Sequence, residues 1–284
     1  MPRPCDRISR RAGPALILLA LLASGPTFHP AAARDAEPWD LGTDRDAFTP
    51  CTHTVAPGTI LTEGSYVYID NVVGYPTNNY PEWLLRVGGT EWLEWRFGVN
   101  YGVGSQGNVV TSVEVGEGAI LGLMPYESSV LYGFKVNTST QEGWMPESCF
   151  IMEASTPLQS EVLGTVPVAT GVCGWELPVG LRRAKPCRID TSLRYAYTER
   201  LLGRYSRWSP SAVLRVPVTE RWEVHAEYFS SVSDLTRVTI SQEYFSPGTH
   251  IMITKNFELG VRVGWGQTRT SAPFFSDAGF GWHW

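Results

Sequence analysis

His225 is the residue of this sequence whose surroundings best suit acid–base chemistry, since Glu223 and Glu227 share its face of an extended strand. A histidine beside carboxylates can act as a general base, and Ser211, diagonal to it in a predicted hairpin, would be the nucleophile of a lipid hydrolase. Charge-paired groups of this kind are more often members of a structural network. The chain also has no G-x-S-x-G, H-E-x-x-H or phosphate-binding glycine loop. We therefore predict no catalytic residue and no enzyme activity.

The other histidines give no sign of a metal site. His53, His250 and His283 are isolated in the sequence, so we expect neither a metal ion nor a cofactor. The cysteines downstream of the N-terminal leader have no zinc-type spacing, and in an oxidising compartment they allow three disulfide pairings among which the sequence does not choose. These cysteines are Cys51, Cys149, Cys173 and Cys187.

Charged residues lie at alternating positions of extended segments. Between Glu91 and Tyr101 every second residue is apolar, and Glu94 and Arg96 occupy intervening positions. This period of two predicts a strand with one apolar and one polar face, which fits either a lipid-facing barrel or a soluble sandwich. Charges recur on the second face of strand after strand, which favours a polar lumen. The predicted interior residues are Arg86, Glu94, Arg96, Glu114, Lys135, Glu176, Arg194, Arg215, Glu223, His225, Glu227, Glu258 and Arg262.

One hairpin sequence recurs along the chain. Leu85–Trp95 aligns without gaps on Leu214–Val224, and Ile253–Leu259 is a weaker third copy. A three-residue connection at residues 89–91, and its equivalents, would fix the residue pairs across each hairpin. Those pairs are Arg86 with Glu94, Arg215 with Glu223, and His250 with Glu258. They would rigidify the barrel or form a selectivity ring, and the structural role is the commoner one.

The connections predict a barrel. Abundant glycine (28) and proline (20) favour many short strands and turns. Longer polar connections are expected at residues 71–80, 137–147, 201–207 and 230–236, opposite the short turns, which is the pattern of short periplasmic turns and longer outer loops. Between Tyr101 and Trp208 the segments 109–115, 128–136, 149–155, 172–179 and 191–198 have strand composition, and parity requires four or six. We predict four strands between these residues. The sequence therefore predicts an all-β, antiparallel up-and-down transmembrane β-barrel of about twelve strands, and any number from ten to fourteen is compatible with it.

The last eleven residues, Phe274–Trp284, have the pattern of a closing strand. Counting back by twos from Trp284 places Trp282 and Phe280 on one face. A soluble domain rarely leaves three large rings exposed at a terminus, although the last strand of a soluble β-sandwich is the alternative. We predict that these three residues form an assembly signal for the barrel-assembly machinery and contact outer-membrane lipid.

The N-terminus has the features of an export signal. Arginines precede the apolar run 15–23, and residues 31–33 are alanines. The run is too short for a membrane helix, which needs ~20 residues. We predict a cleaved signal peptide over residues 1–33, an irregular periplasmic segment over 34–57 and an outer-membrane barrel over 58–284. The net charge of −5 gives no footprint for nucleic acid, and the oligomeric state is left open.

A set of short motifs spans the mature chain. They are D-R-D-A-F-T at 44–49, V-A-P-G at 55–58, P-E-W-L-L-R-V-G at 81–88, T-E-W-L-E-W-R-F-G at 90–98, Y-G-F-K at 132–135, A-E-Y-F at 226–229 and the terminal D-A-G-F-G-W-H-W. In these motifs the chain resembles the MetA-pathway phenol-degradation family of bacterial outer-membrane proteins, and it departs from that family over residues 157–187. The resemblance implies a barrel and a transport role, and only the family's name implies an aromatic solute.

The predicted function is passive movement of small solutes, aromatic or otherwise hydrophobic, through the lumen without energy coupling. Arg86, Glu94 and Arg96 would line the pore and set its ion selectivity. The alternative is a structural or surface-binding outer-membrane barrel with a filled lumen, and the lipid hydrolase ranks third. A twelve-stranded interior can be filled by side chains or leave a narrow channel, and the sequence does not decide between them.

Overall fold

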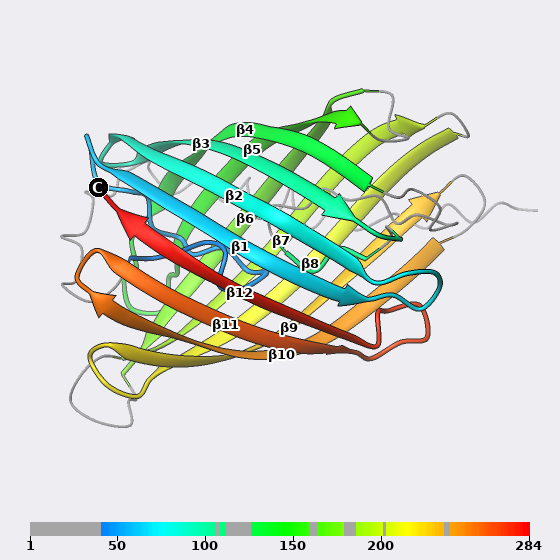
Figure 1. Ribbon diagram of the computed structural model, residues 1–284. Helices are drawn as coiled ribbons and strands as arrows, with labels where there is room; N and C mark the ends of the chain where they lie inside the picture. The colour runs from blue at the N-terminus through cyan, green and yellow to red at the C-terminus, as the bar shows by residue number, and fades with distance from the viewer. Residues whose placement is uncertain are drawn as a thin grey trace, which may run out of the picture.

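Twelve antiparallel strands, joined in chain order, form a closed barrel in which the last strand pairs with the first (Figure 1). This computed structural model describes residues 41–105, 108–111, 126–159, 164–178, 186–200, 203–235 and 239–284. The strands are β1 (Ile60–Asp70), β2 (Thr77–Thr90), β3 (Leu93–Val103), β4 (Tyr126–Ser139), β5 (Glu147–Gln159), β6 (Val166–Leu177), β7 (Cys187–Arg200), β8 (Gly203–Pro217), β9 (Trp222–Leu235), β10 (Thr239–Thr254), β11 (Phe257–Gly266) and β12 (Phe274–His283). The predicted all-β barrel of twelve strands is confirmed. Over the described ranges, no helix has the length and apolar character needed to cross a membrane.

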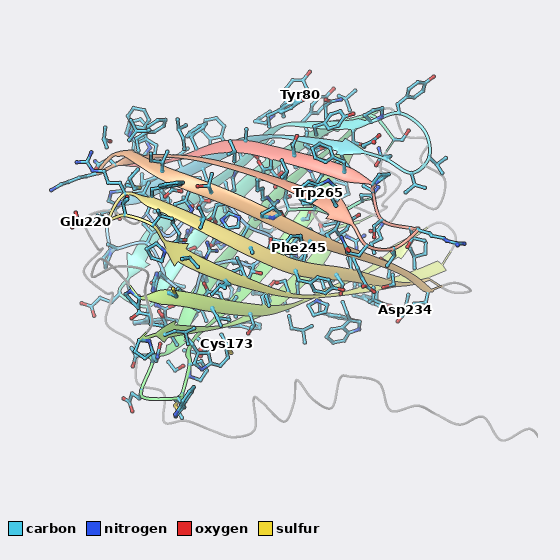
Figure 2. The ribbon with its side chains drawn as sticks, turned by 90° about the horizontal axis from the view of Figure 1, so that it is seen from below. Tyr80, Cys173, Glu220, Asp234, Phe245 and Trp265 are labelled. Carbon is cyan, nitrogen blue, oxygen red and sulfur yellow. The ribbon has the colours of Figure 1, made fainter. Side chains whose placement is uncertain are left out.

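The two faces of the strands divide as the alternation predicts. In β3 the side chains of Glu94 and Arg96 are buried, whereas Trp95 and Phe97 are 46% and 49% exposed. Phe245 and Trp265 pair across β10 and β11 and are likewise exposed on the outer surface (Figure 2). An outer surface with this many exposed rings needs an apolar surrounding, because water solvates such an area poorly. The polar face is therefore the inside of the barrel.

The predicted register of the repeated hairpin is wrong by two residues. Arg86 lies opposite Arg96 rather than Glu94. The cause is the turn: residues 91 and 92 alone connect the strands, and the pairing shifts between Gly88 and Thr90. Because the shift is even, every side chain keeps its predicted face. The two related hairpins shift in the same way, so that the observed pairs are Arg215 with His225 and His250 with Gly260.

Three expectations about strands and connections are also corrected. Residues 203–207 of the expected loop 201–207 belong to β8, and residues 230–235 of the expected loop 230–236 belong to β9. The segment 137–147 joins β4 to β5 at the same end of the barrel as the turn at 91–92, since β3 begins and β4 ends there. It is therefore not an outer loop opposite the short turns. Of the five candidate strands, 109–115 is not a strand where the structure describes it: Val109 and Val110 lie outside any strand and are buried inside the barrel. Residues 112–115, including Glu114, lie outside the described residues.

Residues 41–57, which we call the lumen segment, occupy the barrel interior (Figure 1, blue). They contain no strand, and their buried side chains belong to Thr43, Asp44, Arg45, Ala47, Phe48, Thr49, Pro50, Cys51, Thr52 and Val55. An irregular chain is buried here at low cost because lumen side chains satisfy its backbone N–H groups. The rest of the predicted periplasmic segment, residues 34–40, and the predicted signal peptide over 1–33 lie outside the described residues.

Candidate functional site in the barrel lumen

Asp44 is the central anion of the lumen segment. Its carboxylate accepts hydrogen bonds from Arg96 and from Lys135 Nζ at 3.0 Å, and Arg86 Nε lies 3.7 Å away. All four side chains are buried. Burial favours the neutral acid, but Arg86, Lys135 and Arg96 outweigh it and hold the pKa of the Asp44 carboxyl well below its usual range. A buried carboxylate shared by several cations anchors the segment to β2, β3 and β4.

Arg86 joins the lumen segment to the barrel wall. It is ion-paired with Glu94, with Nε–Oε1 and Nη2–Oε2 distances of 2.8 and 2.9 Å, although the two residues are not directly opposite. Its guanidinium also donates to the carbonyl oxygens of Gly42 and His53 at 2.6 and 2.9 Å, and to Glu63 Oε1 at 3.1 Å. Every direction of the guanidinium is therefore used within the network. Arg86 acts here as a structural clamp on the segment.

A second group of charges holds the segment on the opposite wall. Glu227 accepts hydrogen bonds from the backbone N–H groups of Phe48 and Thr49 at 2.9 and 2.7 Å. Arg262 Nη1 lies 3.5 Å from the same carboxylate. Arg262 also donates to the carbonyl oxygen of Val110 at 2.6 Å, which ties residues 108–111 into the interior. Glu227 and Arg262 are both predicted interior residues. They hydrogen-bond the backbone of the lumen segment and of residues 108–111, respectively, inside the lumen.

Apolar side chains fill the space between these charges. The rings of Phe48 and Phe229 stack at 4.4 Å with an interplanar angle of 5°. Tyr244 and Phe275 pack around Phe229, with ring centroids at 4.9 and 6.0 Å. Val110 belongs to the same buried cluster. These packed side chains fill the space between the lumen segment and the wall formed by β1, β9, β10 and β12.

A cavity of about 1250 Å³ lies between the lumen segment and the end of the barrel at which β12 terminates. Its wall includes Asp46 and Cys51 from the segment, and Glu223 and His250 from β9 and β10. Glu258 of β11 also lines it. The lumen is thus a vestibule on this side of the segment, and beyond it the cluster around Phe48 and Phe229 is packed.

Arg215 does not make the contact predicted from the hairpin register. It forms ion pairs with Asp46 and Asp190, at 2.8 and 3.3 Å, and Glu223 lies opposite Pro217. The shift of two residues across β8 and β9 is the reason, because it moves Glu223 away from the position facing Arg215. Asp46 of the lumen segment is the ion-pair partner of Arg215 in place of Glu223.

The predicted pairing of His225 with Ser211 is wrong. Ser211 faces Phe229, and its hydroxyl is hydrogen-bonded to Thr49 and Ser192, both at 2.7 Å. The structure instead places His225 beside His250 of the adjacent strand β10, with ring centroids 6.4 Å apart. The prediction that His250 is isolated is therefore wrong as well. The two histidines meet across the β9–β10 ladder, in which His225 lies opposite Gly248 and Glu223 opposite His250, and the repeated hairpin sequence carries no information on that ladder.

The predicted assembly residues lie on the outer surface at the closing strand. Trp282 and Trp284 are 45% and 69% exposed, and their rings stack at 5.5 Å. Trp284 donates its backbone N–H to Ile60 O at 2.9 Å, which seals β12 to β1 at the end of the chain. Phe280 makes an edge contact with Trp83 of β2 at 6.5 Å. These rings stabilise the seam where the first and last strands meet.

Sequence reasoning missed the residues of the lumen segment as contributors to the interior. Asp44, Arg45 and Asp46 alternate in sign, and each finds an opposite charge on the wall: Arg45, for example, pairs with Asp277 at 3.2 Å. The signal that could have found them is this charge run within the D-R-D-A-F-T motif, because an exposed tail has no need of matched charges.

No protein-family model matches the chain, and no curated protein sequence matches it. Solved β-barrels are similar in fold. An outer membrane channel from Pseudomonas putida F1 has a TM-score of 0.54 at 8% identity, covering 82% of this chain and 98% of that one. The NanC porin has a TM-score of 0.48 at 8% identity, covering 78% and 98%. The translocator domain of the autotransporter NalP from Neisseria meningitidis has a TM-score of 0.48 at 9% identity, covering 80% and 89%.

The likeness to the Pseudomonas channel shows that this chain has the fold of an outer-membrane β-barrel. At 8% identity it shows the fold alone. The resemblance of the sequence motifs to the phenol-degradation family stays a prediction.

Proposed function

We propose that the protein is an outer-membrane β-barrel channel for small solutes that is closed by its own N-terminal lumen segment. The observation that carries this proposal is the occupation of the lumen by residues 41–57, which are held by ion pairs and hydrogen bonds. The apolar outer surface supports placement in a lipid bilayer. Short turns belong at the periplasmic side of such barrels, so the end with the chain terminus would face the periplasm.

The attachment of the segment supports a movable closure. Residues 41–57 join the barrel through Gly58, whose φ of 74° suits a sharp change of chain direction. The four described cysteines are free thiols, so no disulfide links the segment to the wall. Contacts made only by charges and packing can be exchanged for water when the segment leaves. An open lumen would then be lined by Arg86, Glu94 and Arg96, as the sequence predicts.

An aromatic solute suits the interior that the segment would uncover. Phe48 lies flat on Phe229, and Tyr244 and Phe275 complete an aromatic wall. When Phe48 leaves, a planar solute can occupy its position and gain the same stacking energy. An aromatic solute is also the class that the resemblance to the phenol-degradation family implies.

The second candidate is a structural or surface-binding barrel whose lumen is permanently filled. The observation in its favour is the number of partners that Arg86 and Asp44 have in the buried network, since each must be given up on opening. The two candidates differ in one property, which is whether the lumen segment ever leaves its position.

Single-channel recording in planar bilayers separates them. The mature chain and a variant lacking residues 34–56 are folded in detergent, and their heat-modifiable gel mobility checks that both form barrels. We expect rare openings of the mature chain and sustained conductance of the deletion variant. A folded deletion variant without conductance would refute the channel. A mature chain that never opens, beside a conducting deletion variant, would support the permanently filled barrel.

A further inference from the structure

We propose that Asp46, His225 and His250 form a binding site for a divalent transition-metal ion such as Zn²⁺. The three residues come from the lumen segment, β9 and β10, and one ligand atom from each lies within 4.8 Å of the others. Asp46 precedes β1 and His225 belongs to β9, so the two residues are far apart in the sequence. They meet because the lumen segment lies inside the barrel.

The donor atoms of this group are available. Neither ring nitrogen of His225 has a hydrogen-bond partner, although the residue is only 4% exposed. Asp46 Oδ2 lies 2.8 Å from Arg215 Nη1 and 3.3 Å from His250 Nδ1, and Asp46 Oδ1 has no hydrogen-bond partner. Buried polar atoms without partners are rare and need a physical reason. A metal ion accepting lone pairs from His225 and from Asp46 Oδ1 supplies one.

The backbone around His225 leaves room for its ring. Gly248 lies opposite His225 in the β9–β10 ladder, and a Cβ at position 248 would stand 2.3 Å from His225 Nε2. Any other residue type at this position would push the imidazole away from the group. The absence of a side chain at Gly248 is therefore what permits His225 to lie beside His250.

An ion can reach the site and fit it. His250 and Asp46 line the cavity of about 1250 Å³, which opens a path from the end of the barrel. Three atoms within 4.8 Å of one another have a common centre at most about 2.8 Å from each, and Zn–N and Zn–O bonds of ~2.0–2.2 Å require only small side-chain rotations. Water from the cavity can supply the remaining ligand.

The donor set selects the class of ion. Two imidazoles and one carboxylate suit Zn²⁺ and its neighbours in the first transition row, whereas Mg²⁺ and Ca²⁺ prefer oxygen ligands alone. Arg215 holds the Asp46 carboxylate through Oδ2, which leaves Oδ1 for the ion. The carboxylate of Glu223 lies 3.6 Å from His250 Nε2. It can orient the His250 imidazole through Nε2, which leaves Nδ1 for the ion. Metal ligands commonly have such supporting hydrogen-bond acceptors and donors.

A bound ion would tie the lumen segment to the barrel wall, because Asp46 belongs to the segment and both histidines belong to strands. The binding itself does not depend on the channel proposal, since a permanently filled barrel would hold the same three ligands.

The test is titration of Zn²⁺ into the mature chain, purified without a histidine tag and freed of metal with a chelator, followed by calorimetry. Co²⁺ serves as a spectroscopic probe of the ligand geometry. We expect one Zn²⁺ per chain and at least about a tenfold loss of affinity in each of His225→Gln, His250→Gln and Asp46→Asn. His283→Gln is the matched control, because His283 lines the same cavity outside the group, and its affinity should equal that of the parent.

Three results would overturn the proposal: no Zn²⁺ binding by the folded mature chain, unchanged affinity in both histidine variants, or an equal loss in His283→Gln. Heat-modifiable mobility shows whether each variant still forms a barrel. If His225→Gln does not fold, His250→Gln decides, since His250 faces the cavity and its replacement disturbs less of the buried interior.

Discussion

Replacing Asp44 by asparagine removes the anion that Arg96, Lys135 and Arg86 share, and it should release the lumen segment. The change keeps the size of the side chain and leaves Lys135, which is fully buried, without its carboxylate partner at 3.0 Å. Breaking a buried ion pair by removing one partner costs about 3–5 kcal/mol. Water enters the lumen when the segment leaves and solvates the uncompensated cation, so this cost falls on the closed state.

The magnitude follows from that cost. At 1.4 kcal/mol for each factor of ten, the ratio of open to closed molecules should rise roughly 100-fold to several thousand-fold. Open probability in single-channel recordings of Asp44→Asn and of the parent measures this ratio directly. Glu220→Gln, which removes one negative charge from the exposed β8–β9 turn, is the control for net charge (Figure 2).

A double variant tests the cause. Lys135→Met added to Asp44→Asn removes the uncompensated cation and should restore part of the closure, which a double-mutant cycle measures as coupling between the two positions. If Asp44→Asn folds and its open probability equals that of Glu220→Gln, the buried ion pairs do not hold the segment and the reasoning is refuted. Additive effects of the two changes would show that Asp44 acts through something other than Lys135.

Three further predictions concern the pore, the terminus and the location. In the variant lacking residues 34–56, neutralising Arg86 and Arg96 to glutamine should shift reversal potentials towards cation selectivity, and unchanged potentials would remove them from the conducting path. Deleting Trp282–Trp284 should lower the yield of assembled barrel measured by heat-modifiable mobility, because the β12–β1 seam loses the hydrogen bonds of Trp284 to Ile60 and Thr62 and β12 loses the Trp282 contact with Phe257 of β11; normal assembly would contradict an assembly signal. Fractionation should recover the protein with the outer membrane, and recovery from the soluble periplasm without detergent would contradict a membrane barrel.

The strand number and the two faces could be predicted because they depend on local periodicity. In β3 every exposed ring and every buried charge follows from a period of two, whatever the partner strand. The register could not be predicted, since it depends on turn length. The two-residue turn at 91–92 together with the bulge between Gly88 and Thr90 places Arg96, in place of Glu94, opposite Arg86 in the ladder without changing any face.

The contents of the lumen depend on contacts that no local pattern encodes. Asp44 and Lys135 lie far apart in the chain, and their contact exists because the barrel closes around the segment. The proximity of the His225 and His250 rings needs the antiparallel β9–β10 ladder and a glycine at position 248, opposite His225. The motif containing Asp44–Thr49 was visible in the sequence, but its charges point to an interior only when the wall they match is known.

The charges of the wall also bear on whether the barrel survives without its segment. Arg86 and Arg96 keep their ion pairs with Glu63, Glu94 and Glu153 when the segment is removed, while Lys135 loses its partner Asp44. Three wall carboxylates then still match three wall cations in number. A wall that depended on the segment for neutrality would be expected to collapse or misfold when the segment is removed, because unpaired charges in a dry interior are costly. This wall can instead be hydrated in place, since its remaining ion pairs persist and water takes the positions of the segment's backbone. The balance within the wall is therefore a physical reason to expect that the closed lumen and a water-filled lumen are alternative states of the same stable barrel.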